Sequence, residues 1–320
     1  MRVQYGLTME NFAPESKPVP TGDELVAYAR RAEALGFDSV WVWDHLFLGA
    51  KTAFPFVESL TTLTWLAAHT TTLKLGTGVL VLPVRNPTVL AKVAGSLQML
   101  SGGRLSLGMA AGWYEREFHA VGVPFKGRGR AMETNLEILY RLWDEDSVTG
   151  SYDEMEFKSV RMLPRPTPRP EVLIGGYVDR VLERAATRSD GWLTYFYPAD
   201  SFARSWAKIR NYAEQAGRDP DQLRNVSQLP LCIADSFEEA DVRVRSFIGD
   251  YFDVAEWSDS TPDSAIRGTP EQCAEQLAEH LAAGVEHVVF VPCGYEMEQV
   301  ERLAAEVLPL LPGDWRIGQS

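Results

Sequence analysis

Cysteine is scarce in this chain, with three residues among 320. Cys232, Cys273 and Cys293 are widely spaced, and no Cys-x-x-Cys pair or Cys/His cluster is present. The usual spacing of a zinc site or a redox-active pair is therefore missing, and no metal site is expected. We expect the three thiols to be reduced, buried and structural.

Long apolar runs and clustered positive charge are also lacking. No apolar stretch reaches the roughly 20 residues of a membrane span, and the start of the chain carries no signal-peptide pattern. The net charge of −13 repels phosphate backbones, and no stripe of Lys and Arg interleaved with aromatic residues offsets it locally. We therefore expect a cytoplasmic protein that has neither a nucleic acid nor a membrane as its partner.

Strand-like and helix-like segments alternate along the chain. Strands are expected at Val3–Leu7, Asp38–Asp44, Leu73–Leu82, Arg104–Met109, Glu171–Ile174, Gly191–Thr194, Val226–Ala234 and His287–Val291. Helices are expected at Asp23–Leu35, Glu58–Thr70, Pro87–Ser101, Arg130–Trp143, Tyr177–Arg188, Ser201–Ala216, 236–283 and Glu296–Leu310. Residues 144–170 are turn-rich and polar, which predicts an insertion.

Eight strands, each followed by a helix, predict a (β/α)8 TIM barrel in the α/β class. The length suits a single barrel domain over residues 1–320 with the insertion at about 144–170. The alternative is a doubly wound open sheet, but no Gly-x-Gly-x-x-Gly follows the first strand.

The most informative motif is an apolar strand that ends in an acid and an imidazole. The run Val40–Trp43 fits a strand covered on both faces, and Asp44 and His45 follow at its carboxyl end, where βα barrels place their chemistry. A carboxylate beside an imidazole can orient the ring, raise its pKa or relay a proton near neutral pH. Alternatively, Asp44 caps the next segment and His45 is a packed histidine.

Glycines interrupt one other predicted strand and follow two more. Gly78, with a second glycine two residues earlier, predicts a bulge, which approaches a planar ligand or serves barrel curvature alone. Gly112 is followed by Trp113, which either walls a pocket or packs as an ordinary aromatic residue. Gly175 and Gly176 precede a helix, whose free N–H groups favour a phosphate, although a diglycine turn without a ligand fits equally well.

Together these motifs resemble the superfamily of luciferase-like monooxygenases and deazaflavin-dependent oxidoreductases. The similarity extends over nearly the whole chain. It rests on Gly36–Trp41 with Asp44–His45, Leu75–Leu82 with Arg85 and Pro87, Leu100–Arg104 with Gly108 and Gly112–Trp113, Gly175–Gly176, Ser189–Trp192, Gly268–Glu271 and Ala283–Val285.

The resemblance implies a flavin-like ring across the carboxyl-terminal mouth of the barrel. It implies a cis Gly78–Val79 peptide bond behind the ring, Thr77 and Gly112 near the ring or its tail, and the phosphate toward Gly175 and Gly176. The cofactor-binding residues expected on this basis are Asp44, Thr77, Gly78, Val79, Gly112, Gly175, Gly176 and Tyr177. The catalytic pair would be His45, which handles a proton, and Asp44, which holds the ring or the imidazole.

The superfamily uses both FMN and the deazaflavin coenzyme F420, and the Asp44–His45 pair favours the deazaflavin because many FMN monooxygenases of the family carry Glu-His there. An excess of Arg over Lys points the same way, since it suggests a GC-rich genome. The sugar-phosphate dehydrogenases of the superfamily have a glutamate where Trp113 stands, so a glucose 6-phosphate substrate is not expected. Instead, Trp43 and Trp113, with Tyr195 or Phe196, would form an apolar or aromatic substrate pocket.

The expected function is hydride transfer between coenzyme F420 and a small organic substrate. One alternative is a luciferase-like monooxygenase that uses reduced FMN, supplied by a flavin reductase, and oxygen. A flavin-binding barrel without catalysis is the other. The resemblance also implies a homodimer that pairs through helices near strands two and three, with the apolar stretch Leu60–Leu66 as a candidate surface.

Overall fold

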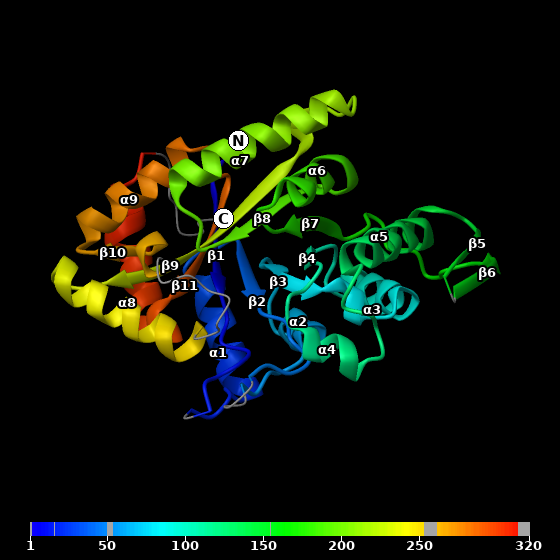
Figure 1. Cartoon of the computed structure of the whole chain (residues 1–320). Coiled ribbons are helices and arrows are strands. Elements are labelled where there is room, and N and C mark those ends of the chain that lie inside the picture. Colours follow the sequence, from blue (N-terminus) through cyan, green and yellow to red (C-terminus); the bar gives the residue numbers. More distant parts are fainter. Residues whose placement is uncertain (1, 16, 50–53, 154, 253–260, 313–320) are drawn as a thin grey trace.

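The computed structural model describes residues 2–15, 17–49, 54–153, 155–252 and 261–312, and its centre is a closed barrel of eight parallel strands (Figure 1). The strands are β1 (Gln4–Thr8), β2 (Ser39–Val42), β3 (Lys74–Val81), β4 (Leu105–Ala110), β7 (Glu171–Gly175), β8 (Gly191–Tyr195), β9 (Arg224–Ile233) and β11 (His287–Pro292). Strand β1 pairs with both β2 and β11, and β8 pairs with β9, so the ring has no open edge. The predicted (β/α)8 fold is confirmed.

Helices surround the barrel and follow the predicted order. They are α1 (Gly22–Ala34), α2 (Ser59–Ala67), α3 (Pro87–Leu100), α4 (Glu115–Ala120), α5 (Arg128–Asp144), α6 (Asp179–Arg188), α7 (Ala199–Gln215), α8 (Phe237–Phe252), α9 (Pro270–Ala282) and α10 (Met297–Arg302). Local chemistry fixes several starts: the Thr21 side chain accepts from the Glu24 N–H in a capping box, and Pro87 opens α3 after Asn86. Within the described ranges, no helix has the length and apolar character needed to cross a membrane.

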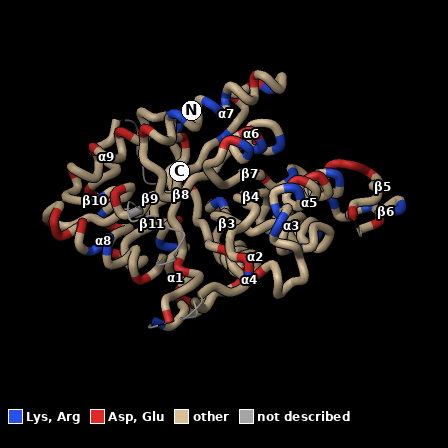
Figure 2. Tube along the Cα trace, viewed as in Figure 1, with Lys and Arg blue, Asp and Glu red and all other residues tan. Residues whose placement is uncertain are grey.

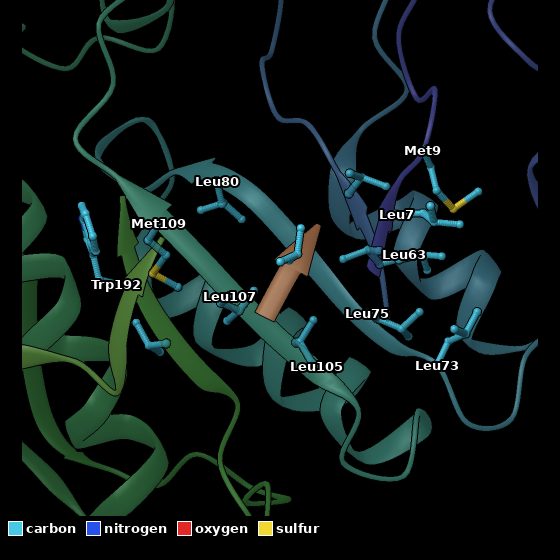
Figure 3. Close-up of a cluster of buried hydrophobic side chains, with 14 of the residues drawn as sticks. Leu7, Met9, Leu63, Leu73, Leu75, Leu80, Leu105, Leu107, Met109 and Trp192 are labelled. Atoms are coloured by element: carbon cyan, nitrogen blue, oxygen red, sulfur yellow. The ribbon is translucent and has the colours of Figure 1, made fainter. Parts of the chain in front are cut away.

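Two apolar layers stabilise the barrel, one on each side of the strands. The outer layer lies between strands and helices, and Figure 3 shows part of it, with Leu75 on β3, Leu107 on β4 and Leu63 on α2. The inner layer consists of Trp41, Leu173, Leu193, Val226 and Val289, packed with Val79. Successive residues of a strand alternate between the layers, because side chains on a strand point to opposite faces.

Gly76 on β3 makes room for the largest inner side chain. A Cβ at Gly76 would lie 2.2 Å from Cδ2 of the Trp41 ring, closer than two unbonded carbons can approach. The first glycine of the predicted bulge therefore serves packing inside the barrel, and only the second, Gly78, lies at the mouth.

The region after β9 differs from its predicted form. A continuous helical region was expected over 236–283, but α8 and α9 are separated by β10 (Ile266–Gly268), which pairs with the end of β9. Residues 253–260 of that region lie outside the described residues. The prediction missed β10 because three residues show no periodicity; all three are buried.

Two other segments contain structure that was not predicted in detail. The stretch from Trp113 to Gly127, which lies between the strand predicted at Arg104–Met109 and the helix predicted at Arg130–Trp143, contains the short helix α4. The predicted insertion holds an antiparallel hairpin of β5 (Val148–Tyr152) and β6 (Met155–Val160), which projects beyond α5 (Figure 1).

Candidate active site

A cavity of about 940 Å³ opens at the carboxyl-terminal end of the barrel. Its walls come from the carboxyl ends of β3, β4, β7 and β8, from the segments that follow β1, β2, β4 and β7, and from the end of α8. Of the residues predicted to form the site, Trp43, Asp44, His45, Gly78, Val79, Gly112, Trp113, Gly175, Gly176, Tyr177 and Tyr195 all line it. Thr77 is absent from this lining: it is fully buried, and its Oγ1 donates to the Gly108 carbonyl at 2.9 Å.

His45 is held by a glutamate that the sequence analysis did not identify. Its Nδ1 lies 2.9 Å from Oε2 of Glu117 on α4, and Glu117 Oε1 accepts the Leu46 N–H at 2.5 Å. The Glu117 side chain is 1% exposed and that of His45 is 13% exposed. Because the carboxylate accepts from the backbone on one oxygen and faces Nδ1 with the other, Nδ1 is the donor in this pair. The second ring nitrogen, Nε2, has no hydrogen-bond partner among the described residues.

Asp44 occupies a different network from the imidazole next to it. Its carboxylate accepts from Ser59 Oγ at 2.9 Å, from the Val81 N–H at 3.0 Å and from Arg85 at 2.5 Å. Arg85 also pairs with Glu58 at 3.0 Å. The imidazole is therefore bonded to Glu117 rather than to Asp44, which corrects one of the two roles expected for Asp44. Asp44 therefore joins the end of β2 to the end of β3.

The end of β3 forms another wall of the cavity and has the predicted bulge. The Gly78–Val79 peptide bond is cis, and the pairing with β4 shifts register between Thr77 and Leu80. A Cβ at Gly78 would lie 1.8 Å from Nε2 of Gln228, so any larger residue there would have to displace the Gln228 side chain. Gly78, Ala110, Ala111 and Gly112 together give the cavity one wall without large side chains.

One end of the cavity is aromatic. It contains Phe12, Trp43, Phe56, Trp113, Tyr195, Tyr251 and Phe252 together with Leu48. Trp43 is fixed by a hydrogen bond from Nε1 to the Tyr295 hydroxyl at 2.9 Å. Tyr177 and Tyr195 are also joined, because the Tyr195 N–H donates to the Tyr177 hydroxyl at 3.0 Å. Burial raises the pKa of both phenols, so they stay neutral near pH 7.

The other end is basic, and the sequence analysis missed this feature. Four arginines, Arg128, Arg130, Arg180 and Arg184, line the cavity beside Gly175 and Gly176, together with Glu133 and Glu183. Arg184 is paired with Glu133 at 2.6 Å, and Arg128 donates to the Gly112 carbonyl at 2.8 Å. Arg130 and Arg180 are exposed and have no carboxylate partner within the described ranges. The spacing of Arg180 and Arg184, four residues apart on one helix, is a signal that could have found this end.

The sequence and the fold both match known proteins. The sequence model of the family described as luciferase-like monooxygenase matches residues 1–287. Among solved structures, an F420-dependent secondary alcohol dehydrogenase superposes with a TM-score of 0.82 over 98% of this chain and 100% of that one, at 17% identity. At that identity the likeness shows the fold alone.

Of three relatives at higher identity, one is uncharacterized and two are named for different activities. An uncharacterized protein of Mycobacterium tuberculosis is 33% identical, with 71% of this chain and 81% of the relative covered. An F420-dependent glucose-6-phosphate dehydrogenase of Amycolatopsis mediterranei is 24% identical over 97% of this chain and 98% of the relative. An FMNH2-dependent dimethylsulfone monooxygenase of Pseudomonas fluorescens is 26% identical over 88% and 85%.

Proposed function

The chain belongs to the luciferase-like monooxygenase family and is a flavin- or deazaflavin-dependent oxidoreductase or monooxygenase, and from this premise we propose that it transfers a hydride between coenzyme F420 and a small apolar organic substrate. The observation that carries the proposal is the placement of His45. Its imidazole lines the cavity beside Phe56 and Trp113, with Nδ1 bonded to a buried carboxylate and Nε2 unengaged.

The cavity fits a flat ring that carries a phosphate. Gly78, Val79 and Gly112 would contact the ring, because their wall leaves the space that larger side chains would fill. Gly175, Gly176 and Arg180 would hold the phosphate at the basic end, where unpaired guanidinium groups favour an anion. A bound deazaflavin supplies the hydride chemistry.

The residues of this chain supply the proton chemistry. Because the Nδ1–H of His45 donates to Glu117, the proton-transfer atom of the ring would be Nε2. When the hydride moves, Nε2 would accept a proton from an alcohol or return one to a carbonyl. Glu117 holds the ring in one tautomer and offsets the positive charge when the imidazole is protonated. Asp44 keeps the ends of β2 and β3 together and acts on the site through the backbone.

The substrate would bind at the aromatic end. In the part of that wall that the structure describes, no lysine or arginine lines the cavity to hold a phosphorylated substrate. Arg85 lies behind the wall and is paired with Asp44, and His45 is paired with Glu117. Trp43, Trp113 and Tyr195 would contact an apolar ring or chain.

A cofactor titration followed by a substrate panel tests the proposal. The purified protein is expected to bind oxidised F420 more tightly than FMN in fluorescence titrations. It should then reduce bound F420 with cyclic or aromatic secondary alcohols, followed as loss of deazaflavin absorbance without oxygen, and not with glucose 6-phosphate. Tighter binding of FMN, or FMN carried through purification, would contradict the choice of cofactor.

An FMN-dependent monooxygenase is the second candidate, favoured by the similarity to the Pseudomonas enzyme. It would require a reductase partner to supply reduced flavin. Oxygen consumption and oxygenated product with reduced FMN, combined with no turnover of F420, would establish this alternative in place of the first. Tight cofactor binding without turnover of any substrate would instead favour a non-catalytic barrel.

A further inference from the structure

A second, smaller cavity lies next to the basic end of the candidate active site. It measures about 300 Å³ and is lined by Arg130, Glu133, Thr134, Leu136, Glu137, Tyr140 and Arg141 of α5 and by Arg188 of α6. Arg130 and Glu133 line both cavities, so the two lie next to each other. We call this second cavity the α5–α6 groove. The basic residues of both helices are visible in Figure 2.

The charges of the α5–α6 groove are only partly neutralised. Arg141 is paired with Glu145 at 2.7 Å, and Glu133 is paired with Arg184. Arg130 and Arg188 are exposed and have no carboxylate partner in the described part of the chain. Glu137 accepts the Tyr152 hydroxyl at 2.7 Å and remains the opposing charge.

The unpaired Arg130 and Arg188 indicate that the groove holds an anion and not just solvent. Unpaired arginines stand out on a chain of net charge −13, because most of its surface repels anions.

We propose that the α5–α6 groove binds the carboxylates of a cofactor side chain that extends beyond the phosphate, with Arg130 and Arg188 as its partners. This inference rests on the proposed function. A deazaflavin coenzyme continues past its phosphate as a chain of glutamates, whereas FMN ends at the phosphate held near Gly175 and Gly176. The groove therefore contributes to the affinity for F420 and leaves that for FMN unchanged.

Titrations with three forms of the deazaflavin test the groove: one without a phosphate, one with the phosphate and no glutamate, and one with several glutamates. At low salt the glutamates should tighten binding to the wild type by about two- to five-fold for each arginine engaged, as exposed ion pairs do. The gain should shrink as salt is raised. Arg188→Gln and Arg130→Gln should each lose part of it, and the double variant most of it.

Arg31→Gln is the matched control, because Arg31 is an exposed arginine on α1 that lines neither cavity. It should keep the full gain, and all variants should unfold at the wild-type temperature. Equal affinity of the wild type for forms with and without glutamates would overturn this inference alone. Binding of FMN and of no deazaflavin would overturn the choice of cofactor as well.

Discussion

Two neighbouring residues at the end of β2 have different tasks. Asp44 accepts three hydrogen bonds from β3 and its surroundings, whereas His45 turns to Glu117 on α4. A mutation at either residue would reduce activity, so loss of activity alone does not identify the proton-transfer group. The distinction requires separate measurements of turnover, binding and pH dependence.

His45→Ala is expected to lower kcat by roughly 10²–10⁴-fold with little change in F420 affinity, because it removes the proton-transfer group and leaves the cofactor wall intact. Glu117→Gln should lower kcat less, by roughly 10–10³-fold, and shift the pH profile, because the imidazole loses its ionised partner. Glu117→Asp should recover part of the activity.

Steady-state kinetics over a range of pH at saturating cofactor provide the measurement. Glu115→Gln is the control, since Glu115 lies on the same helix and is exposed. If His45→Ala kept near-normal kcat and an unchanged pH profile, His45 would be a packing residue and the proton would come from another group or from water.

Two buried histidines make stability depend on pH. Burial lowers the pKa of His280 to about 4 and, with Lys74 as a smaller cause, that of His287 to about 3. Both are neutral in the folded protein at pH 5, but in the unfolded chain they are protonated below about pH 6.5. The unfolded state thus binds more protons, and stability falls as the pH is lowered from about 6.5 toward the folded pKa values.

His280→Leu should remove one of these contributions. Between pH 8 and pH 5, the free energy of unfolding should fall by about 2 kcal/mol less in the variant than in the wild type. His280 Nδ1 has no hydrogen-bond partner within the described residues, so the substitution breaks no bond of that atom. Urea unfolding at the two pH values gives the comparison, and identical losses in both proteins would show that His280 titrates normally.

At the scale of elements, the sequence predicts most of the barrel because each strand is an apolar run and each helix has a cap or an apolar stripe. The short elements could not be predicted: β10 has three residues and α4 has six.

The residues of the functional site were likewise predictable only where they lie at the ends of long strands. Residues at strand ends, such as His45 and Gly175, were found from their position, whereas Glu117 lies in α4 among exposed charged residues and has no local signal of its own.

Strand β3 offers a direct test of inner-barrel packing. Gly76→Ala should destabilise the protein by about 1–3 kcal/mol, since its Cβ would overlap the Trp41 ring. Gly249→Ala in α8 is the matched control, with nothing within 4 Å of its Cβ, and should stabilise by about 0.5–1 kcal/mol. Thermal unfolding of both variants decides it, and an unchanged Gly76→Ala would mean that the Trp41 ring moves freely.

At the scale of the whole molecule, the surface near α2 and α3 revises the expected contact between subunits. The leucines of the stretch Leu60–Leu66 are buried against the barrel and are not available to a partner. The exposed apolar side chains of this side are Trp65 on α2 and Val89, Val93, Met99 and Leu100 on α3. Exposed apolar groups gathered on two neighbouring helices are typical of an interface.

A homodimer through α2 and α3 remains the prediction, with these exposed residues in place of the leucines. Val93→Glu combined with Leu100→Glu should convert a dimer at micromolar concentration into a monomer, because it would bury charge without a partner. Val242→Glu, at an exposed position on α8, should leave the dimer intact.

Two chains of net charge −13 repel each other, so added salt should tighten the wild-type dimer. Sedimentation velocity measures all of these, and a wild-type monomer at micromolar concentration would contradict the prediction.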